Sequence, residues 1–443
     1  MRIIKIYLIG CMLILSFSVL LIGTTFISNV QDKKGISNVF SILATRDSFE
    51  CKWNRTWGGN NTDWSRETVV DSSHNVYLAG FTWSFGAGYA DMCLVKYDGN
   101  GMQQWNRTWG GTSFDYGNGV AVDLSDNVYL AGYTSSFGEG YNDMILVKYD
   151  GNGEQQWNRT WGDANPNFCN AVVVDSSGNV YITGHTEGDI ILVKYDGNGM
   201  QQWNCTWDDG DEDYGRGMAV DLSGNIYIAG ENGYLGVGGE MFDMILVKYD
   251  GNGVQQWNRT WGGADYDTSD GVAVDSSGNV YLAGRTESFG VGVNDMALVK
   301  YNGEGIQQWN RTWGDANPNF CNAVAVDSSG NAYLVGGSGN YGLGNGNMAL
   351  VKYDGNGVLQ WNYTWGGDNN DCGYGIAVDS SDSVYLAGGT ESFGAGVEDM
   401  FLVKYSSYIA PASIPSYNLF VIIGIIGIST LLSVKKKGQQ RSN

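Results

Sequence analysis

The chain has 443 residues, of which 66 are glycine and only 4 are proline, and its formal net charge is −22. This acidity excludes nucleic acid as a partner, because binding to phosphates needs a basic surface. Frequent glycine, aromatic and β-branched residues without long helical periodicity predict an all-β protein.

The first residues have the character of a targeting segment. Arg2 and Lys5 precede an apolar run over residues 6–23, and small and polar residues follow it. This order predicts a signal peptide or an uncleaved anchor over residues 1–28. Residues 29–49 are then expected to form a linker.

Residues 50–405 consist of one repeated pattern. In the copy at residues 117–161, short apolar segments predict strands over 119–123, 127–132, 144–149 and 154–161, joined by Gly-rich and Asp-containing turns. Four antiparallel strands in each repeat of about fifty residues predict a β-propeller. An open solenoid is the alternative, but it would need capping repeats with polar outer faces, and none is evident.

The strand count indicates how the ring closes. The pentapeptide Trp-Asn-x-Thr-Trp marks each fourth strand and begins at residues 53, 105, 157, 203, 257, 309 and 361. The seventh repeat stops after its third strand at Tyr405, whereas residues 50–57 are a fourth strand with no repeat before them. We therefore expect a seven-bladed propeller in which the N-terminal strand completes the last blade, because closure removes exposed sheet edges.

The C-terminal residues predict a membrane anchor. Residues 406–416 form a short stalk, residues 417–434 are mostly apolar, and Lys435, Lys436 and Lys437 follow. The pattern predicts a transmembrane helix over 417–434 and a cytoplasmic tail over 435–443. We thus expect a single-pass protein of the cell membrane, with the propeller on the extracellular side.

The repeats resemble a known family. The motifs at residues 119–132 and 143–150, together with the Trp-containing strand, are similar to the SBBP β-propeller repeat family. That resemblance implies a propeller fold and an extracytoplasmic location, and it carries over no catalytic residues. The tail resembles the membrane anchor of some archaeal cell-surface proteins.

Two rings of residues emerge when the repeats are aligned with one another. The first is expected around the channel mouth, on the face with variable loops, and is a candidate ligand site because it differs among otherwise similar repeats. It consists of Arg66, Asn118, Asn170, Arg216, Asp270, Asn322 and Tyr374. Relaxed drift at a solvated channel mouth is the alternative explanation.

The second ring lies three residues earlier and contains only Asp or Asn. Its aspartates are Asp63, Asp115, Asp213, Asp267 and Asp371. They either form Asx-type turns that lead into the first strand or supply oxygen ligands to Ca²⁺, the one cofactor that the residues suggest.

Each pentapeptide is also an N-glycosylation sequon. The acceptor residues are Asn54, Asn106, Asn158, Asn204, Asn258, Asn310 and Asn362. The alternative is that Asn and Thr are simply the polar, outward residues of an edge strand. Strand alternation places them opposite the Trp and Arg side chains, which are expected to pack against the neighbouring blade.

No catalytic motif is evident, so the sequence favours a membrane-tethered scaffold that binds a protein or a glycan through its variable face. Two alternatives remain open. One is an extracytoplasmic enzyme, either glycan-active or similar to quinoprotein propellers, and the other is a structural component of the cell envelope.

Overall fold

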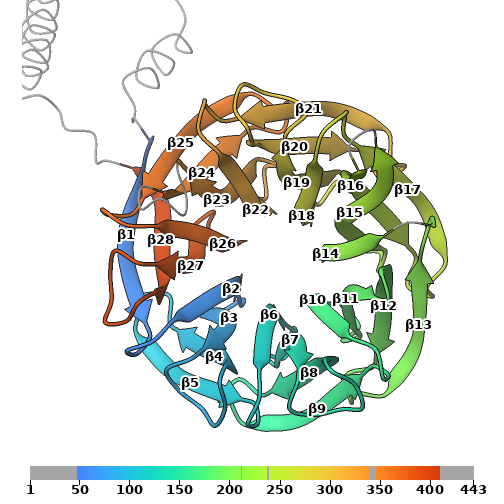
Figure 1. The fold of residues 1–443 in the computed structure, drawn as a ribbon. Helices are drawn as coiled ribbons and strands as arrows, with labels where there is room; N and C mark the ends of the chain where they lie inside the picture. Colours follow the sequence, from blue (N-terminus) through green and yellow to red (C-terminus); the bar gives the residue numbers. More distant parts are fainter. Residues whose placement is uncertain (1–46, 211, 237–238, 340–345, 410–443) are drawn as a thin grey trace, which may run out of the picture. The chain divides into compact units, whose positions relative to one another are not determined.

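The computed structural model describes residues 47–210, 212–236, 239–339 and 346–409. Its 28 strands form seven four-stranded antiparallel sheets arranged as the blades of a propeller (Figure 1). Residues 50–406 form one compact unit. Within the described ranges, no helix is long and apolar enough to cross a membrane. The predicted signal peptide or anchor and the predicted transmembrane helix both lie outside these ranges.

The strands of the first four blades follow one another along the chain. Blade 1 contains β2 (Asp63–Val70), β3 (Val76–Thr82), β4 (Asp91–Tyr97) and β5 (Gln103–Trp109). Blade 2 contains β6 (Asp115–Val122), β7 (Val128–Thr134), β8 (Asp143–Tyr149) and β9 (Gln155–Trp161). Blade 3 contains β10 (Asn167–Val174), β11 (Val180–Thr186), β12 (Asp189–Tyr195) and β13 (Gln201–Trp207). Blade 4 contains β14 (Asp213–Val220), β15 (Ile226–Gly236), β16 (Gly239–Tyr249) and β17 (Gln255–Trp261).

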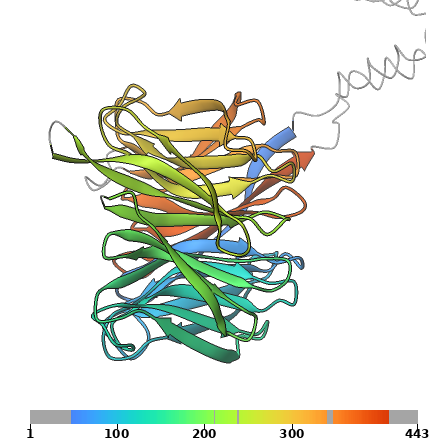
Figure 2. The same ribbon diagram turned by 90° about the vertical axis from the view of Figure 1, so that its right-hand side faces the viewer.

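The last three blades include the one that closes the ring. Blade 5 contains β18 (Asp267–Val274), β19 (Val280–Thr286), β20 (Asp295–Tyr301) and β21 (Gln307–Trp313). Blade 6 contains β22 (Asn319–Val326), β23 (Ala332–Ser338), β24 (Asn347–Tyr353) and β25 (Leu359–Trp365). Blade 7 contains β26 (Asp371–Val378), β27 (Val384–Thr390), β28 (Asp399–Ile409) and β1 (Asp47–Trp57). In blade 4, β15 and β16 are 11 residues long, and their hairpin projects beyond the ring (Figure 2).

The predicted closure is confirmed. In the seventh sheet the strand order is β1-β28-β27-β26, so the N-terminal strand is the outer strand of the last blade. Figure 1 shows β1 lying beside β28 at the rim. Each of the seven sheets then has four strands, so no described blade lacks its outermost strand.

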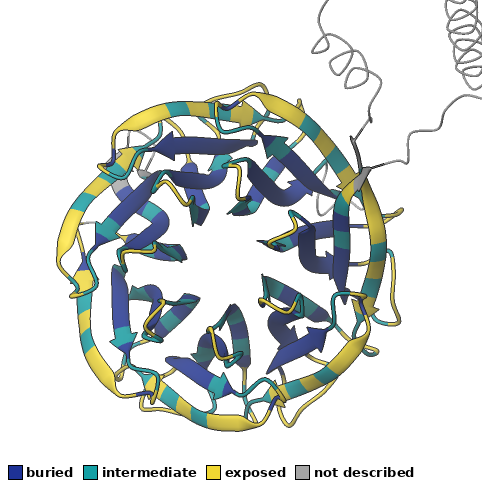
Figure 3. Ribbon diagram, turned by 180° about the vertical axis from the view of Figure 1, so that it is seen from behind, coloured by how far each residue is buried: buried dark blue, intermediate teal, exposed yellow. Residues whose placement is uncertain are grey.

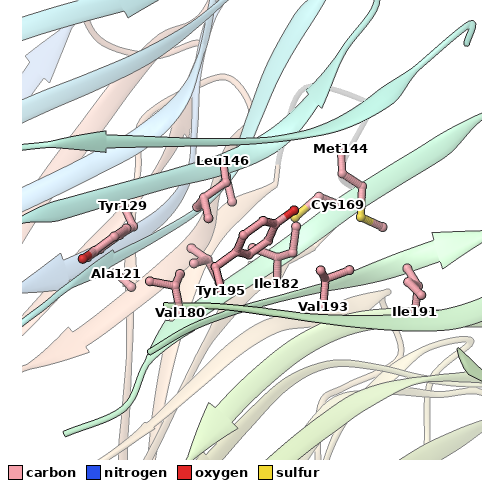
Figure 4. Packing of buried hydrophobic residues seen from close by; sticks show 12 residues of the cluster. Ala121, Tyr129, Met144, Leu146, Cys169, Val180, Ile182, Ile191, Val193 and Tyr195 are labelled. Carbon is pink, nitrogen blue, oxygen red and sulfur yellow. The ribbon is translucent and has the colours of Figure 1, made fainter. Parts of the chain in front are cut away.

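The hydrophobic core lies between neighbouring blades. One cluster joins Tyr129 and Leu146 of blade 2 to Ile182, Val193 and Tyr195 of blade 3 (Figure 4). The second and third strands of each blade are almost fully buried, as in β3 and β4. The first strands do not have the two buried faces that their apolar sequence suggests. Five of the eight residues of β2, for example, stay partly exposed, because the innermost strands border the channel.

The outermost strands alternate as predicted. In β5, Trp105 and Arg107 are half-buried while Asn106 and Thr108 are exposed, and the same banding follows the rim in Figure 3. The Nε atom of Arg107 donates to the carbonyl of Gly153 in the next blade at 2.6 Å. In the five pentapeptides that carry Arg, the Arg side chain therefore binds the neighbouring blade's turn.

The lysines of the third strands also join neighbouring blades. Lys96 lies over the ring of Tyr77, with its Nζ 4.9 Å from the ring centroid, and donates to the carbonyl of Gly151 in the next blade at 3.0 Å. The aspartates of nearby turns are other acceptors that a lysine at this position could pair with. Only the Lys352 ammonium, among the third-strand lysines described, lies within ion-pair distance of one, at 3.7 Å from Asp327. The turn aspartates instead accept hydrogen bonds from backbone amides of their own turns. Asp71, for example, accepts from the backbone amides of Ser73 and Asn75.

Candidate functional site

A β-bulge in each innermost strand shapes the channel mouth. In β2 the ladder passes from Ser65, opposite Gly80, directly to Glu67, opposite Ala79, so that Arg66 is the extra residue. The same shift occurs once in each of the other six innermost strands. The seven extra residues are Arg66, Asn118, Asn170, Arg216, Asp270, Asn322 and Tyr374. A bulge redirects the side chain of its extra residue, and here it points all seven toward one place.

A glycine opposite each bulge makes this geometry feasible. A Cβ added to Gly80 would lie 1.7 Å from the carbonyl oxygen of Trp64. The equivalent glycines of the other blades, such as Gly132 and Gly336, are as tightly packed. The glycine near the end of each second strand therefore fixes the bulge opposite it, and through the bulge the site.

All seven predicted channel-mouth residues line one pocket of about 390 Å³. Glu67, Tyr133, Phe168 and His185 complete its lining. An adjoining recess of about 210 Å³ shares Asp270, Asn322 and Tyr374 and adds Arg285, Phe320 and Cys372. The structure thus brings the predicted ring together, and it places around the ring a second set of residues that the sequence alone did not indicate.

The three asparagines of the ring bind their neighbours. The side-chain nitrogen of Asn118 donates to the carbonyl of Cys169, that of Asn170 to Gly215 and that of Asn322 to Gly373, at 2.7–2.9 Å. Each of these acceptors immediately precedes the next blade's bulge. The asparagine amides therefore hold neighbouring bulges in register.

Aromatic rings form an arc along one side of the mouth. Successive ring centroids lie 4.7–6.0 Å apart along the arc. In order, its members are Tyr374, Trp64, Phe81, Tyr116, Tyr133, Phe168, His185, Tyr214, Phe242 and Tyr266. At the second-strand position that Phe81, Tyr133 and His185 occupy in blades 1 to 3, blades 5 to 7 carry Arg285, Gly337 and Gly389. The mouth of this repetitive protein is therefore strongly asymmetric.

Two arginines at the mouth differ in their partners. Arg216 forms a two-point ion pair with Glu231, with N–O distances of 3.1 and 3.2 Å. Arg66 lies over Trp64, Phe81 and Tyr374, with its guanidinium carbon 4.8–5.7 Å from the ring centroids. Its Nε atom is buried and has no hydrogen-bond partner among the described residues.

The acids and the histidine of the pocket have displaced pKa values. Burial raises the pKa of Glu67 to about 8, although the backbone amide of Thr68 donates to its Oε1 at 3.0 Å. Burial also raises the pKa of Asp270 to about 6, against the opposing effect of Arg216. Burial, with a further contribution from Arg216, lowers the pKa of His185 to about 4. Burial therefore favours the neutral forms of Glu67, Asp270 and His185 in this pocket.

Glu67 is the largest departure from blade symmetry. The residue that follows the bulge is Gly119, Ala171, Gly217, Gly271, Ala323 or Gly375 in the other blades. At this level the innermost strands nearly touch, since a Cβ on Gly375 would lie 2.7 Å from the backbone nitrogen of Thr68. A comparison of this position across the repeats would have identified Glu67. The prediction from the sequence included only the preceding residue, Arg66.

The five aspartates proposed as calcium ligands lie in five different blades and are fully buried. Asp115 is typical, because it accepts from the Thr134 hydroxyl, from Ser136 Oγ at 2.7 Å and from the Gly111 amide at 2.8 Å. Across the described ranges, no group of three or more His, Cys, Asp or Glu side chains could hold a metal ion. These hydrogen bonds join the loop before the first strand to the loop after the second strand, which is a structural role. They do not bring the aspartates together as a set of Ca²⁺ ligands.

The seven sequon asparagines are all exposed, and they lie on the outermost strands, whereas the mouth residues lie on the innermost strands. They lie around the rim, so they do not contribute to the pocket. Whether they carry glycans remains a prediction.

The chain was compared with known proteins. The sequence model of the SBBP family, described as a beta-propeller repeat, matches residues 109–138, 162–191, 208–231 and 256–289. The chain is also 23% identical over 213 residues to an uncharacterized WD repeat-containing protein of Acanthamoeba polyphaga mimivirus. This match covers 37% of the chain but only 15% of that curated relative's length.

Among solved structures, a fungal alcohol oxidase in complex with copper is similar in fold. It is 14% identical, the match covers 84% of this chain and 79% of the oxidase, and the TM-score is 0.53. A protein of unknown function from Dyadobacter fermentans is 12% identical, with 81% and 99% coverage and a TM-score of 0.49. At such low identity, the likeness to the oxidase concerns the fold alone.

Proposed function

Because this chain is built of SBBP β-propeller repeats, we propose that it is a binding module that holds a saccharide at its channel mouth. The observation that carries this proposal is the asymmetric pocket. Seven bulges direct seven polar or aromatic side chains into one space, and the repeats differ at these positions. Concave sites with a few convergent polar groups are the usual ligand sites of rigid scaffolds.

The chemistry of the lining favours a sugar over an apolar ligand. Tyr133, Phe168 and Tyr374 present ring faces and edges on which the C–H groups of a pyranose ring can pack. Arg66, Asn118 and Asp270 supply donors and acceptors for its hydroxyl groups. An apolar ligand would leave these polar groups without partners, which costs about 1–3 kcal/mol for each buried group.

A glycan array probed with the full-length protein tests the proposal. We expect binding to a limited set of saccharides and loss of that binding in Tyr133→Ala. Tyr141→Ala is the matched control, because Tyr141 is an exposed tyrosine in the loop that follows the same strand and does not line the pocket. Absence of binding to every saccharide, or equal binding by both variants, would contradict the proposal.

A hydrolytic activity on the bound saccharide is a second candidate. Two carboxyl groups with raised pKa, those of Glu67 and Asp270, line the same pocket, and such pairs serve acid–base chemistry in enzymes that cleave glycans. Chromatography of the bound saccharide after prolonged incubation distinguishes the two candidates. Intact ligand supports a binding module, and shortened products support an enzyme.

We further propose that the propeller is displayed outside the cell membrane and is held there by the C-terminal segment. The apolar residues 417–434 and the lysines that follow them support this location. Membrane fractionation, followed by protease treatment of intact cells, tests it. Recovery of the uncleaved chain in the soluble fraction would rule it out.

A further inference from the structure

The geometry points to a second subsite beside the mouth, and we propose that it receives the acetamido group of an N-acetylated amino sugar. This inference rests on the proposed saccharide binding and narrows it to one class of sugar. Three features of the molecule carry it, namely a side-chain position that is empty in blade 6, the recess of about 210 Å³ beside the mouth, and the groups that line this recess.

The first feature is a repeated position near the end of each second strand. In blades 1 to 3 this position carries an aromatic ring that fills the space between two first-strand residues. The ring centroid of Tyr133, for example, lies 5.1 Å from that of Tyr116 in blade 2 and 5.0 Å from that of Phe168 in blade 3. Phe81 and His185 make the same two kinds of contact. A side chain at this position therefore closes the gap between neighbouring blades.

Blade 6 has no side chain at this position. Gly337 lies opposite Phe320 in the ladder, and the first-strand residue of the next blade is Cys372. Apart from chain neighbours, only the Sγ of Cys372 among the described atoms would lie within 4 Å of a Cβ added to Gly337, at 3.2 Å. Blade 7 also has a glycine there, but a Cβ on Gly389 would lie 2.5 Å from the Oε1 of Glu398, whose side chain fills that space. Gly337 therefore leaves a gap between blades 6 and 7.

The second feature is the recess, which lies at this gap. Its lining includes Phe320 and Cys372, the residues on either side of Gly337. Three residues line both the recess and the main pocket, namely Asp270, Asn322 and Tyr374. The two spaces are therefore continuous, and a ligand held at the mouth can extend a substituent into the recess.

The third feature is the chemistry of the recess, which begins with two apolar walls. Phe320 supplies an aromatic ring, and the thiol of Cys372 is buried and behaves as a small apolar group. A hydroxyl group placed between these walls would lose hydrogen bonds to water, whereas a methyl group would gain free energy by leaving water. The walls therefore favour a methyl group.

Polar groups of the same recess match an amide. The carboxyl oxygens of Asp270 can accept from an amide N–H. Arg285 donates through its Nε to the Thr268 hydroxyl at 3.1 Å, and its guanidinium has further N–H groups that can donate to an amide carbonyl. Because one acid and one arginine line the recess, it favours a neutral group over a charged one. An acetamido group combines the methyl, the N–H and the carbonyl in one neutral substituent.

Matched oligosaccharides test the subsite. The first pair is chitotetraose, whose sugars carry acetamido groups, and cellotetraose, which has the same backbone with hydroxyl groups in their place. The second pair consists of oligosaccharides of N-acetylgalactosamine and of galactose with the same linkage. Isothermal titration with the full-length protein should show at least one acetamido form binding about ten-fold more tightly than its hydroxyl counterpart, the factor expected from one buried methyl group and one added hydrogen bond.

Two substitutions fill the recess from opposite walls. Gly337→Phe adds the side chain that blade 1 has at the equivalent position, Phe81, and Cys372→Tyr adds the one that blade 2 has, Tyr116. Both variants should fold, because other blades carry these side chains, and thermal melting checks this. Each should lower the affinity for the acetamido form to that for the hydroxyl form, and either variant alone suffices. Gly337→Ala is the matched control and should keep the preference, because a methyl group leaves most of the recess open.

The outcomes separate the subsite from the proposed function. Equal affinity for the acetamido and hydroxyl forms would overturn the subsite while leaving saccharide binding intact, and so would a preference that survives in a folded filling variant. Binding confined on the glycan array to saccharides without an acetamido group would have the same consequence. Absence of binding to every saccharide would overturn both.

Discussion

Closure of the ring by β1 can be tested by removing residues 50–57. This strand joins two blades. Trp53 and Trp57 pack against a cluster that combines Val76, Leu78 and Tyr97 of blade 1 with Tyr385 and Leu402 of blade 7. Arg55 reaches the turn of blade 1, where its Nε donates to the carbonyl of Gly101 at 2.6 Å.

The expected loss is large compared with the stability of a domain. Truncating a fully buried tryptophan costs about 3–5 kcal/mol, so two half-buried rings together contribute roughly 3–5 kcal/mol. The hydrogen bonds of Arg55 add about 1–2 kcal/mol. The sum approaches the roughly 5–15 kcal/mol by which domains are stable, and it omits the backbone edge that β28 would expose.

Calorimetric melting and analytical ultracentrifugation provide the assay. The truncated protein should melt at a much lower temperature without one cooperative transition, or it should associate through the open edge. A peptide of residues 47–57 added in trans should restore the transition. Removal of residues 29–46, which precede β1, is the matched control. If the protein without residues 50–57 melts like the intact chain and stays monomeric, the closure argument is refuted.

Three further predictions concern single residues. Gly336→Ala should destabilise blade 6 by about 3 kcal/mol, because the new Cβ would lie 1.7 Å from the carbonyl of Phe320. Its neighbour Gly337→Ala should cost less than about 1 kcal/mol in the same urea titration, because only the Cys372 Sγ lies near, at 3.2 Å. Asp213→Asn should raise the melting temperature at pH 8 and leave it nearly unchanged at pH 4. Burial raises the pKa of Asp213 to about 7, so its contribution to folding is present at low pH and is lost as pH rises through that value. Asn106→Gln should lower the mass of protein made in a glycosylating host by one glycan, whereas Asn100→Gln, outside any sequon, should not.

Each of these has a clear contrary result. Equal unfolding free energies for the two glycine variants would mean that the bulge does not require Gly336. A melting temperature of Asp213→Asn that rises equally at both pH values would show that ionisation of Asp213 is not the cause. An unchanged mass for Asn106→Gln would remove Asn106 from the glycosylated set.

Much of the candidate site could be predicted because the repeats provide an internal alignment. The ring from Arg66 to Tyr374 was found as a set of equivalent positions that differ, and the structure brings all seven to one pocket. The bulges that point them there were not predicted, because a bulge depends on the pairing of two strands and leaves little trace in either one alone. The aromatic arc was also missed, since it combines first-strand residues such as Tyr116 with second-strand residues such as Tyr133.

The sequence by itself determined the number of blades, the identity of the outermost strands and the closure by residues 50–57. These follow from counting repeated strands and from the rule that an open sheet edge must be covered. Only the tertiary structure decided where the lysines and arginines bind, because their acceptors are turn carbonyls of the next blade, about 40 to 57 residues away along most of the chain. It also decided that Glu67 lines the pocket at a position where the other blades have only Gly or Ala. Burial depends on how closely seven strands approach one axis, and no local pattern records that distance.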